Sequence, residues 1–180
     1  HWGTYLENNY GILFGNRRVS GMMPTADYLA TLHLDYRTRR GLATGIDIES
    51  LEMTRKNSSM DGLSMYYADD ADPMINPVDG DRLPTKHQRH RIALHALWDV
   101  TPEADTGSDW QLATNINLLS DRYVLRDFFP DISRTDDKPD NTVRLVRRTS
   151  STQSMLYTRF APNDYYSTNE RVDASFYRVR

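Results

Sequence analysis

The sequence contains no cysteine, which excludes disulfide bonds and thiolate metal sites. It also lacks any run approaching the roughly 18 apolar residues that a membrane-spanning helix needs, and its mean hydropathy is -0.69. A helical membrane protein is therefore excluded. Neither basic nor acidic residues are in large excess. The 22 basic and 25 acidic residues are interspersed and leave a net charge of -3, so nothing indicates a nucleic-acid partner.

What the sequence does have is a strict alternation of apolar and polar residues, clearest between Ala26 and Glu49. A period of two residues indicates β-strands. The turn formers Thr38 to Gly41 separate the two halves, so we expect a long antiparallel hairpin with one apolar and one charged face. The apolar set is Leu32, Leu34, Ile46 and Ile48, and the polar set is His33, Asp35, Asp47 and Glu49.

The same alternation recurs along the rest of the chain. Further strands are expected at residues 2–14, 62–67, 87–99, 110–118, 141–148, 153–161 and 171–179. Leu94 and Ile116 continue the apolar set, and Asn115 and Asn117 continue the polar one. No segment has a convincing helical pattern. The sequence therefore predicts one all-β domain over residues 1–180, an antiparallel up-and-down meander.

Two architectures suit such strands. A transmembrane β-barrel alternates lipid-facing and lumen-facing residues, so its mean hydropathy stays low. Its aromatic girdles would also account for the 11% of aromatic residues. A soluble β-sandwich that binds carbohydrate, with the apolar faces packed inward, is the alternative.

Motifs for catalysis or metal binding are weak. There is no Gly-x-Ser-x-Gly elbow and no phosphate-binding glycine loop. On a strand, His87 and His95 would share a face while His90 points to the other, which argues against a histidine metal site. The acidic residues 69–72 and 79–81 lack the spacing of an EF-hand. We expect no enzyme activity, no cofactor and no metal site.

The stretch from Asp109 to Phe128 resembles a known family. A strand that begins with Trp110 and continues in alternation runs into Ser120-Asp121, Tyr123 and Asp127-Phe128. The earlier hairpin is similar too, with Asp35-Tyr36 followed by the basic turn Arg39-Arg40-Gly41. These segments resemble the β-barrel domain of the LptD family, the lipopolysaccharide-assembly or organic-solvent-tolerance proteins of the outer membrane. The likeness runs in order from about residue 5 to residue 166.

The resemblance implies that the chain is an early part of a transmembrane outer-membrane β-barrel. Its function would be non-enzymatic insertion of lipopolysaccharide into the outer leaflet, as part of membrane biogenesis. The implied partners are lipopolysaccharide, membrane lipid, an LptE-like lipoprotein plug and an LptA-like periplasmic bridge protein, with no nucleic acid. A generic porin-like channel is the alternative. The lumen-facing wall would comprise His33, Asp35, Asp47, Glu49, Asn115 and Asn117, and the lipid-facing set Leu32, Leu34, Ile46, Ile48, Leu94 and Ile116.

Overall fold

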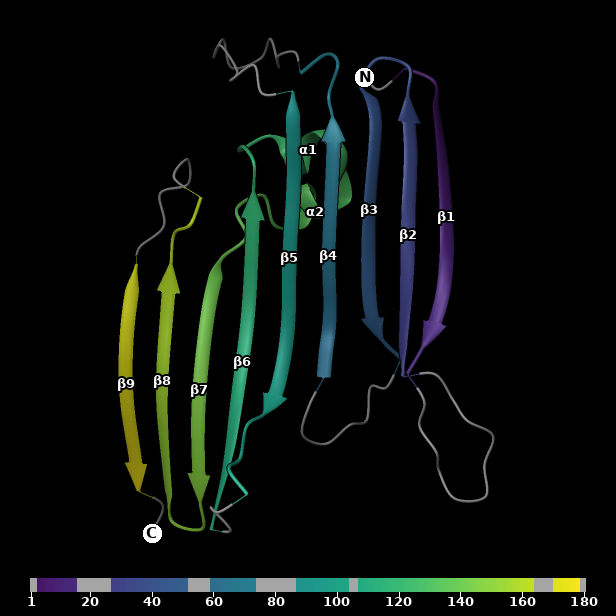
Figure 1. Ribbon diagram of the computed structural model, residues 1–180. Coiled ribbons are helices and arrows are strands. Elements are labelled where there is room, and N and C mark those ends of the chain that lie inside the picture. Colours follow the sequence, from purple (N-terminus) through teal and green to yellow (C-terminus); the bar gives the residue numbers. More distant parts are fainter. Residues whose placement is uncertain are drawn as a thin grey trace, which may run out of the picture.

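The computed structural model describes residues 3–15, 27–51, 59–73, 87–103, 107–163 and 170–178. Over these residues the chain forms one nine-stranded antiparallel sheet in which every strand lies beside its neighbour in sequence (Figure 1). The expected all-β antiparallel meander is confirmed. The strands are β1 Tyr5–Phe14, β2 Tyr28–Arg37, β3 Gly41–Ser50, β4 Ser59–Asp69, β5 Gln88–Asp99, β6 Ser108–Leu119, β7 Asn141–Thr149, β8 Thr152–Phe160 and β9 Arg171–Arg178.

The hairpin of β2 and β3 has the register that the alternation predicts. Arg37 lies opposite Gly41, and the backbone N–H of Arg40 donates to the carbonyl of Arg37 at 3.0 Å to close the turn. Gly41 has a φ of 91°, a conformation that side-chain-bearing residues avoid. A Cβ there would also lie 2.5 Å from the carbonyl oxygen of Asp69. The turn therefore needs glycine for two independent reasons.

The two sides of the sheet differ in chemistry. Cross-strand pairing places Leu32, Ile46, Met65 and Ile92 in one row across β2 to β5, and Leu94 pairs with Ile116. We call this side the apolar face. The opposite side, the polar face, carries His33, Asp35, Asp47, Glu49, Asn115 and Asn117. Each predicted set thus falls on one side of the sheet.

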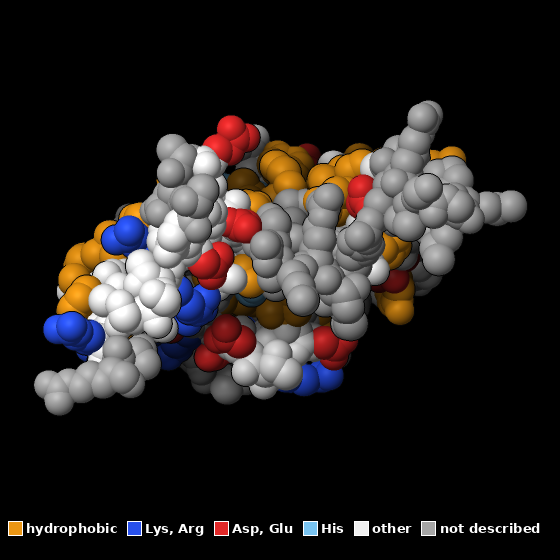
Figure 2. Space-filling view, turned by 90° about the horizontal axis from the view of Figure 1, so that it is seen from below, with side chains coloured by type: hydrophobic (Ala, Val, Ile, Leu, Met, Phe, Trp, Pro, Cys, Tyr) orange, Lys and Arg blue, Asp and Glu red, His pale blue; other side chains and the backbone are white. Residues whose placement is uncertain are grey.

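Several large apolar side chains are exposed on the apolar face, and several charged ones are buried on the polar face. On the apolar face Leu34 is 51% exposed and Leu42 is 53% exposed. On the polar face Asp35, Arg37 and Arg89 are 6%, 4% and 3% exposed. Charged side chains are almost never fully buried unless they are paired. Seen along the strands, hydrophobic side chains gather along the upper margin of the molecule, and several acidic and basic ones lie beneath them (Figure 2).

Two short helices cover part of the polar face, and they correct the expectation that the chain has no helix. They are α1 Val124–Phe128 and α2 Pro130–Thr135, between β6 and β7. We call residues 120–140 the helical insert. Pro130 stands at the start of α2, where its fixed φ suits a first helical turn. Neither helix has the length and hydrophobicity needed to cross a membrane.

The helical insert packs on small side chains of the sheet. Val124, Leu125 and Phe128 are almost fully buried, and they form a cluster with Ala43, Tyr66, Ala68 and Leu119. Alanines at positions 43 and 68 leave the space that Phe128 needs. This cluster is an apolar core beneath the helical insert, on the same side of the sheet as the buried charges.

The sheet is open. Within the described ranges, the outer edges of β1 and β9 pair with no other strand. Because neighbours alternate in direction and the strands are nine, β1 and β9 run the same way, as Figure 1 shows. The upper part of β6, beyond Asn115, is not paired with β7. There the side chain of Asn163 accepts from the N–H of Leu119 at 3.0 Å and donates to the carbonyl of Asn117 at 2.8 Å.

Candidate functional site

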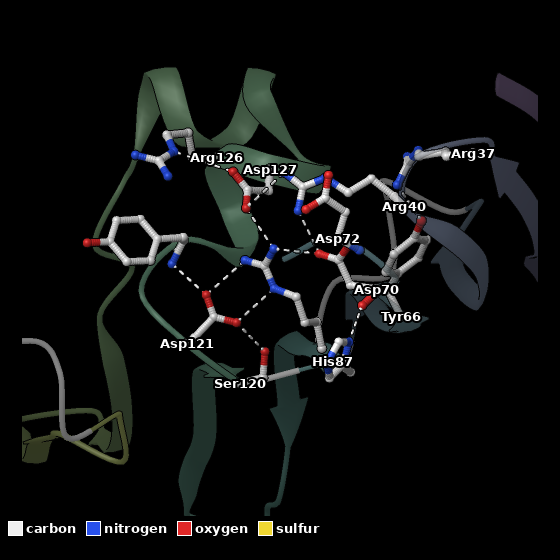
Figure 3. Close-up of polar contacts among 12 residues, drawn as sticks. Arg37, Arg40, Tyr66, Asp70, Asp72, His87, Ser120, Asp121, Arg126 and Asp127 are labelled. Atoms are coloured by element: carbon white, nitrogen blue, oxygen red, sulfur yellow. Dashed lines mark hydrogen bonds and ion pairs between the residues drawn. The ribbon is translucent and has the colours of Figure 1, made fainter. Parts of the chain in front are cut away.

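A network of buried charges lies where the helical insert meets the upper ends of β4 and β5 (Figure 3). Its centre is Arg89, the second residue of β5, whose side chain is 3% exposed. The turn that begins the insert supplies Asp121, and α1 supplies Asp127. The residue that follows β4 supplies Asp70. The network therefore joins three separate parts of the chain.

Arg89 contacts all three carboxylates. Its Nε and Nη2 donate to the two oxygens of Asp121 at 3.0 and 2.8 Å, a fork-shaped pair. Its Nη1 donates to Asp127 at 2.6 Å and to Asp70 at 3.0 Å. A planar guanidinium matches a carboxylate in two parallel hydrogen bonds, which fixes orientation as well as charge. The side chain of Arg89 thereby sets the position of α1 over the sheet.

A second arginine, Arg40 in the turn between β2 and β3, reaches the same acids. Its Nη1 donates to Asp70 at 2.7 Å, and its Nη2 lies 3.4 Å from a carboxylate oxygen of Asp127. Asp70 is completely buried. Its own backbone carbonyl accepts a 2.8 Å hydrogen bond from Nδ1 of His87. The two arginines and three aspartates are thus linked without a gap.

The aromatic ring of Phe128 lies among the guanidinium groups. Those of Arg37, Arg89 and Arg40 lie 4.9, 5.1 and 5.9 Å from its centroid. Cations within about 6 Å of a ring face are attracted to it. Phe128 is therefore held by arginines as well as by the apolar cluster beneath it.

A shorter chain of hydrogen bonds extends the network toward β2. Arg37 donates to the hydroxyl of Tyr66 at 3.1 Å, and that hydroxyl donates to Asp35 at 2.9 Å. The ring of Tyr66 crosses the sheet over Gly45, where a Cβ would lie 2.9 Å from it. The polar face therefore needs a glycine at this position as well.

The electrostatics of Asp121 follow from its partners. Burial by itself would raise the pKa of its carboxyl group. Hydrogen bonds and charge from Arg89 outweigh that effect, together with the hydroxyl of Ser120 and the N–H of Tyr123, and the pKa falls below its ordinary value. Asp121 is therefore ionised at neutral pH and pairs with Arg89 as a carboxylate.

A polar cavity of about 210 Å³ lies beside this network, between the polar face and the helical insert. His33 stands in its wall and contacts Asn9 and Asp47, each at 2.7 Å. The cavity is lined by Glu7, Asn9, His33, Asp35, Arg37, Asp47, Ser64, Tyr66, Phe128 and Phe129.

Three of the predicted wall residues, His33, Asp35 and Asp47, meet at this cavity. Asn117 lies elsewhere on the polar face and hydrogen-bonds to Asn115. Glu49 lies near the end of β3. That this face borders a lumen remains a prediction, as does the contact of the six apolar residues with lipid.

The network itself was not predicted from the sequence. Asp121 and Asp127 were noticed only as parts of a motif, and Arg89 was not singled out. A usable signal was present in the small residues Ala43, Gly45 and Ala68 of the polar face, which leave room for a covering element. Among the described residues no three or more His, Asp or Glu side chains are placed to hold a metal ion. His90 and His95 lie on opposite sides of β5, as the alternation requires.

This arrangement can hold one part of the chain tightly against another. Four arginines and four aspartates, Arg37, Arg40, Arg89, Arg91, Asp35, Asp70, Asp121 and Asp127, are buried or nearly buried around Phe128 and Phe129. Their charges balance. Removing one member of a buried ion pair leaves its partner uncompensated, at a cost of roughly 3–5 kcal/mol. The network therefore holds the helical insert firmly on the polar face.

No family model matches the chain, and no solved structure matches it. A 74-residue segment is 32% identical to a curated protein of Meyerozyma guilliermondii named DNA damage-binding protein CMR1. The match covers 41% of this chain and 13% of that protein.

These findings overturn the predictions that came from the resemblance. Assignment to the LptD family is wrong, and with it lipopolysaccharide insertion, organic-solvent tolerance, the outer-membrane location and the LptE-like and LptA-like partners, because the relative found carries a different name and role. The exclusion of nucleic acid is overturned by the same name. Local structure explains the misleading motif. Ser120-Asp121, Tyr123 and Asp127-Phe128 are the residues that anchor the helical insert.

Proposed function

We propose that this chain forms part of the wall of a membrane-spanning β-barrel and acts without catalysis. The observation that carries the proposal is the reversed burial, with large apolar side chains exposed and ionised ones covered. A soluble monomer rarely exposes a contiguous apolar face of this extent. The acyl chains of a bilayer would cover that face, and the polar face would border a water-filled interior.

The dimensions of the apolar face support this proposal. On β2, Tyr28 and Tyr36 enclose Ala30, Leu32 and Leu34. Eight residues of strand span about 27 Å, which suits the apolar band of about 25 Å between two aromatic girdles in membrane barrels.

Charged residues on this face stand at its margins, with the acidic Asp69 at the upper end of β4 and the basic ones toward the lower end. The register of the described strands places two Arg or Lys residues on this face, Arg178 at the end of β9 and Arg147 of β7. The guanidinium of Arg147 lies 5.4 Å from the ring centroid of Trp110, at the lower end of β6. A cation beside an aromatic residue is typical of the edge of a membrane band, where a long side chain reaches water.

The open edges also favour a larger closed assembly. β1 is ten residues long, is exposed throughout and contains no proline or lysine. Natural sheets protect such an edge with charges, prolines or a covering element, or they remove it by closing a barrel. Because β1 and β9 run the same way, antiparallel closure needs an odd number of additional strands.

Spin labels placed one at a time at positions 32, 33, 34 and 35 of the chain folded in lipid vesicles test the proposal. Labels at 32 and 34 should respond more to lipid-soluble oxygen than to a water-soluble reagent, and labels at 33 and 35 should show the reverse, because neighbours on a strand point to opposite sides. Equal responses at all four positions, or the opposite pattern, would refute the membrane wall.

A second candidate, nucleic-acid binding, is favoured by the 74-residue similarity to a protein named as DNA damage-binding. Arg148 and Arg159 of β7 and β8 lie on the polar face, but they contact Asp109 and Asp140. Fluorescence anisotropy with labelled duplex DNA, intact and damaged, decides the matter. Affinity that falls steeply with salt would support this candidate. Absence of binding at low salt would exclude nucleic-acid binding.

A further inference from the structure

Two hollows meet on the apolar side of the sheet, and together they have the form of a site for an amphiphile. One is an apolar groove of about 490 Å³ over the row that contains Leu32, Ile46, Met65 and Ile92. The other is a more polar pocket of about 520 Å³ at the upper end of β4 and β5. Both have the size of small-molecule sites.

The groove and the pocket share two side chains. Tyr67 and His90, which pair across β4 and β5, line both. Beyond them the polar pocket is completed by His87, Gln88 and Ser120. An alkyl chain in the groove would therefore bring its head group to the polar pocket without a break.

The groove exists because one position in the adjoining row is small. Thr44 lies in register between Leu34 and Tyr67, and its hydroxyl donates to the backbone carbonyl of His33 at 3.1 Å. Its hydroxyl is thus satisfied by the sheet itself, and the remaining surface of Thr44 adds to the apolar lining. Leu32 and Met65 are 40% and 42% exposed along the same groove.

The polar pocket is suited to an anionic head group. Nδ1 of His87 donates to the carbonyl of Asp70, which leaves Nε2 to hydrogen-bond a ligand's carboxyl group, with one proton shared between them. Among the described residues, neither the His90 ring nor the Gln88 side-chain amide has a hydrogen-bond partner. Two imidazoles and an amide supply donors for a carboxylate, and charge-assisted hydrogen bonds are the stronger kind.

We propose that these hollows form a binding site for a single-chain amphiphile with an anionic head group, of the fatty-acid class. The ligand's alkyl chain occupies the groove over Ile46 and Met65, and its carboxylate is bound by His87, Gln88 and His90. This site does not depend on the membrane wall, because the groove and pocket are properties of the sheet itself.

Photocrosslinking of the full chain in dodecyl maltoside micelles tests the site. The probe is lauric acid with a diazirine on its alkyl chain, and adducts are mapped by mass spectrometry. Adducts should concentrate at Met65, Tyr67 and Ile92. Unlabelled lauric acid should displace the probe at least about tenfold better than dodecanol, which has the same chain without the charge. Adducts spread over the apolar face to Leu156 and Phe176 in proportion to exposure, or equal displacement by dodecanol, would overturn the proposal.

Two variants test the binding of the ligand's alkyl chain and of its head group separately. Thr44→Leu fills the groove and should remove most of the crosslinking, whereas Thr158→Leu makes the same change elsewhere on the apolar face, on β8, and should leave it unchanged. The double variant Gln88→Leu, His90→Leu should retain crosslinking but lose the preference for lauric acid over dodecanol. A Thr44→Leu variant that keeps its crosslinking, or a double variant that keeps the preference, would refute the site. Spin labels at Leu156 report bilayer contact independently of these results.

Discussion

Arg89 and Asp121 lie 32 residues apart in the chain, and they meet in a buried two-pronged ion pair. The pair joins the start of β5 to the start of the helical insert. It acts together with Asp127, so one arginine holds both the turn and the helix of the insert. The position of the insert over the polar face therefore depends on very few side chains.

Removing the negative charge of Asp121 should release the helical insert. We expect Asp121→Asn to destabilise the folded chain by roughly 3–5 kcal/mol, because Arg89 would remain buried with an uncompensated share of its charge. The matched control is Asp131→Asn in α2, whose partner Arg134 is 2.9 Å away with both side chains largely exposed. An exposed pair contributes at most about 1 kcal/mol. Urea unfolding of the chain in lipid vesicles measures both, and equal midpoints would contradict the central role of Asp121.

The helical insert should also detach in acid. The pKa of Asp121 is lower in the folded chain than in the unfolded one. A depressed pKa stabilises the fold above the unfolded value of about 3.9, and that contribution is lost as the pH falls through the folded value. Hydrogen exchange of residues 123–128 should therefore be unaffected by this group from neutral pH down to about 4 and accelerate below it, after correction for the intrinsic rate. Asp121→Asn should lack this pH dependence, and a variant that retained it would assign the transition to another group.

The sequence predicted the strands well because their two sides need different chemistry. Alternation from Tyr28 to Arg37 and from Gly41 to Ser50 indicated both the hairpin and the residues on each face. The same reasoning placed the turn before Gly41. Period 2 is a local property, so it can be read from a single sequence.

The charge network could not be predicted from the sequence, because periodicity is a local property and the residues of the network are far apart in the chain. Arg89 lies 38 residues from Asp127, and nothing in the spacing of two polar residues shows that they meet. The helices were missed because α1 and α2 have five and six residues, too few to show a helical period. The LptD assignment failed because short motifs of strand and turn residues were given more weight than they can bear.

The two sides of β2 should respond differently to the same basic substitution. Leu34 is exposed on the apolar face, so Leu34→Arg should destabilise the chain by about 2–4 kcal/mol if that face meets the middle of a bilayer. His33→Arg, one residue earlier on the polar face, should be tolerated far better because its guanidinium would border the polar cavity beside Asp47. Denaturation of each variant in lipid vesicles measures how much stability each substitution costs. Similar losses at both positions would mean that β2 does not separate lipid from water.

Two glycines in neighbouring strands should differ sharply when each is replaced by alanine. A Cβ at Gly45 would lie 2.8 Å from the carbonyl oxygen of Met65 and 2.9 Å from the ring of Tyr66, whereas at Gly62 the nearest atom is 3.9 Å away. Overpacking of this kind costs roughly 1–3 kcal/mol. Gly62→Ala meets no such contact and should gain up to about 1 kcal/mol from the reduced freedom of the unfolded chain.

The same pair of variants reports on the helical insert. Since Tyr66 packs edge-on against Phe129 at 4.9 Å, the displacement caused by Gly45→Ala should reach the insert. Protease cleavage after Arg126 should therefore speed up in Gly45→Ala and stay unchanged in Gly62→Ala. If Gly45→Ala were as stable as the parent and as resistant to cleavage, the ring of Tyr66 would not hold the insert against the sheet.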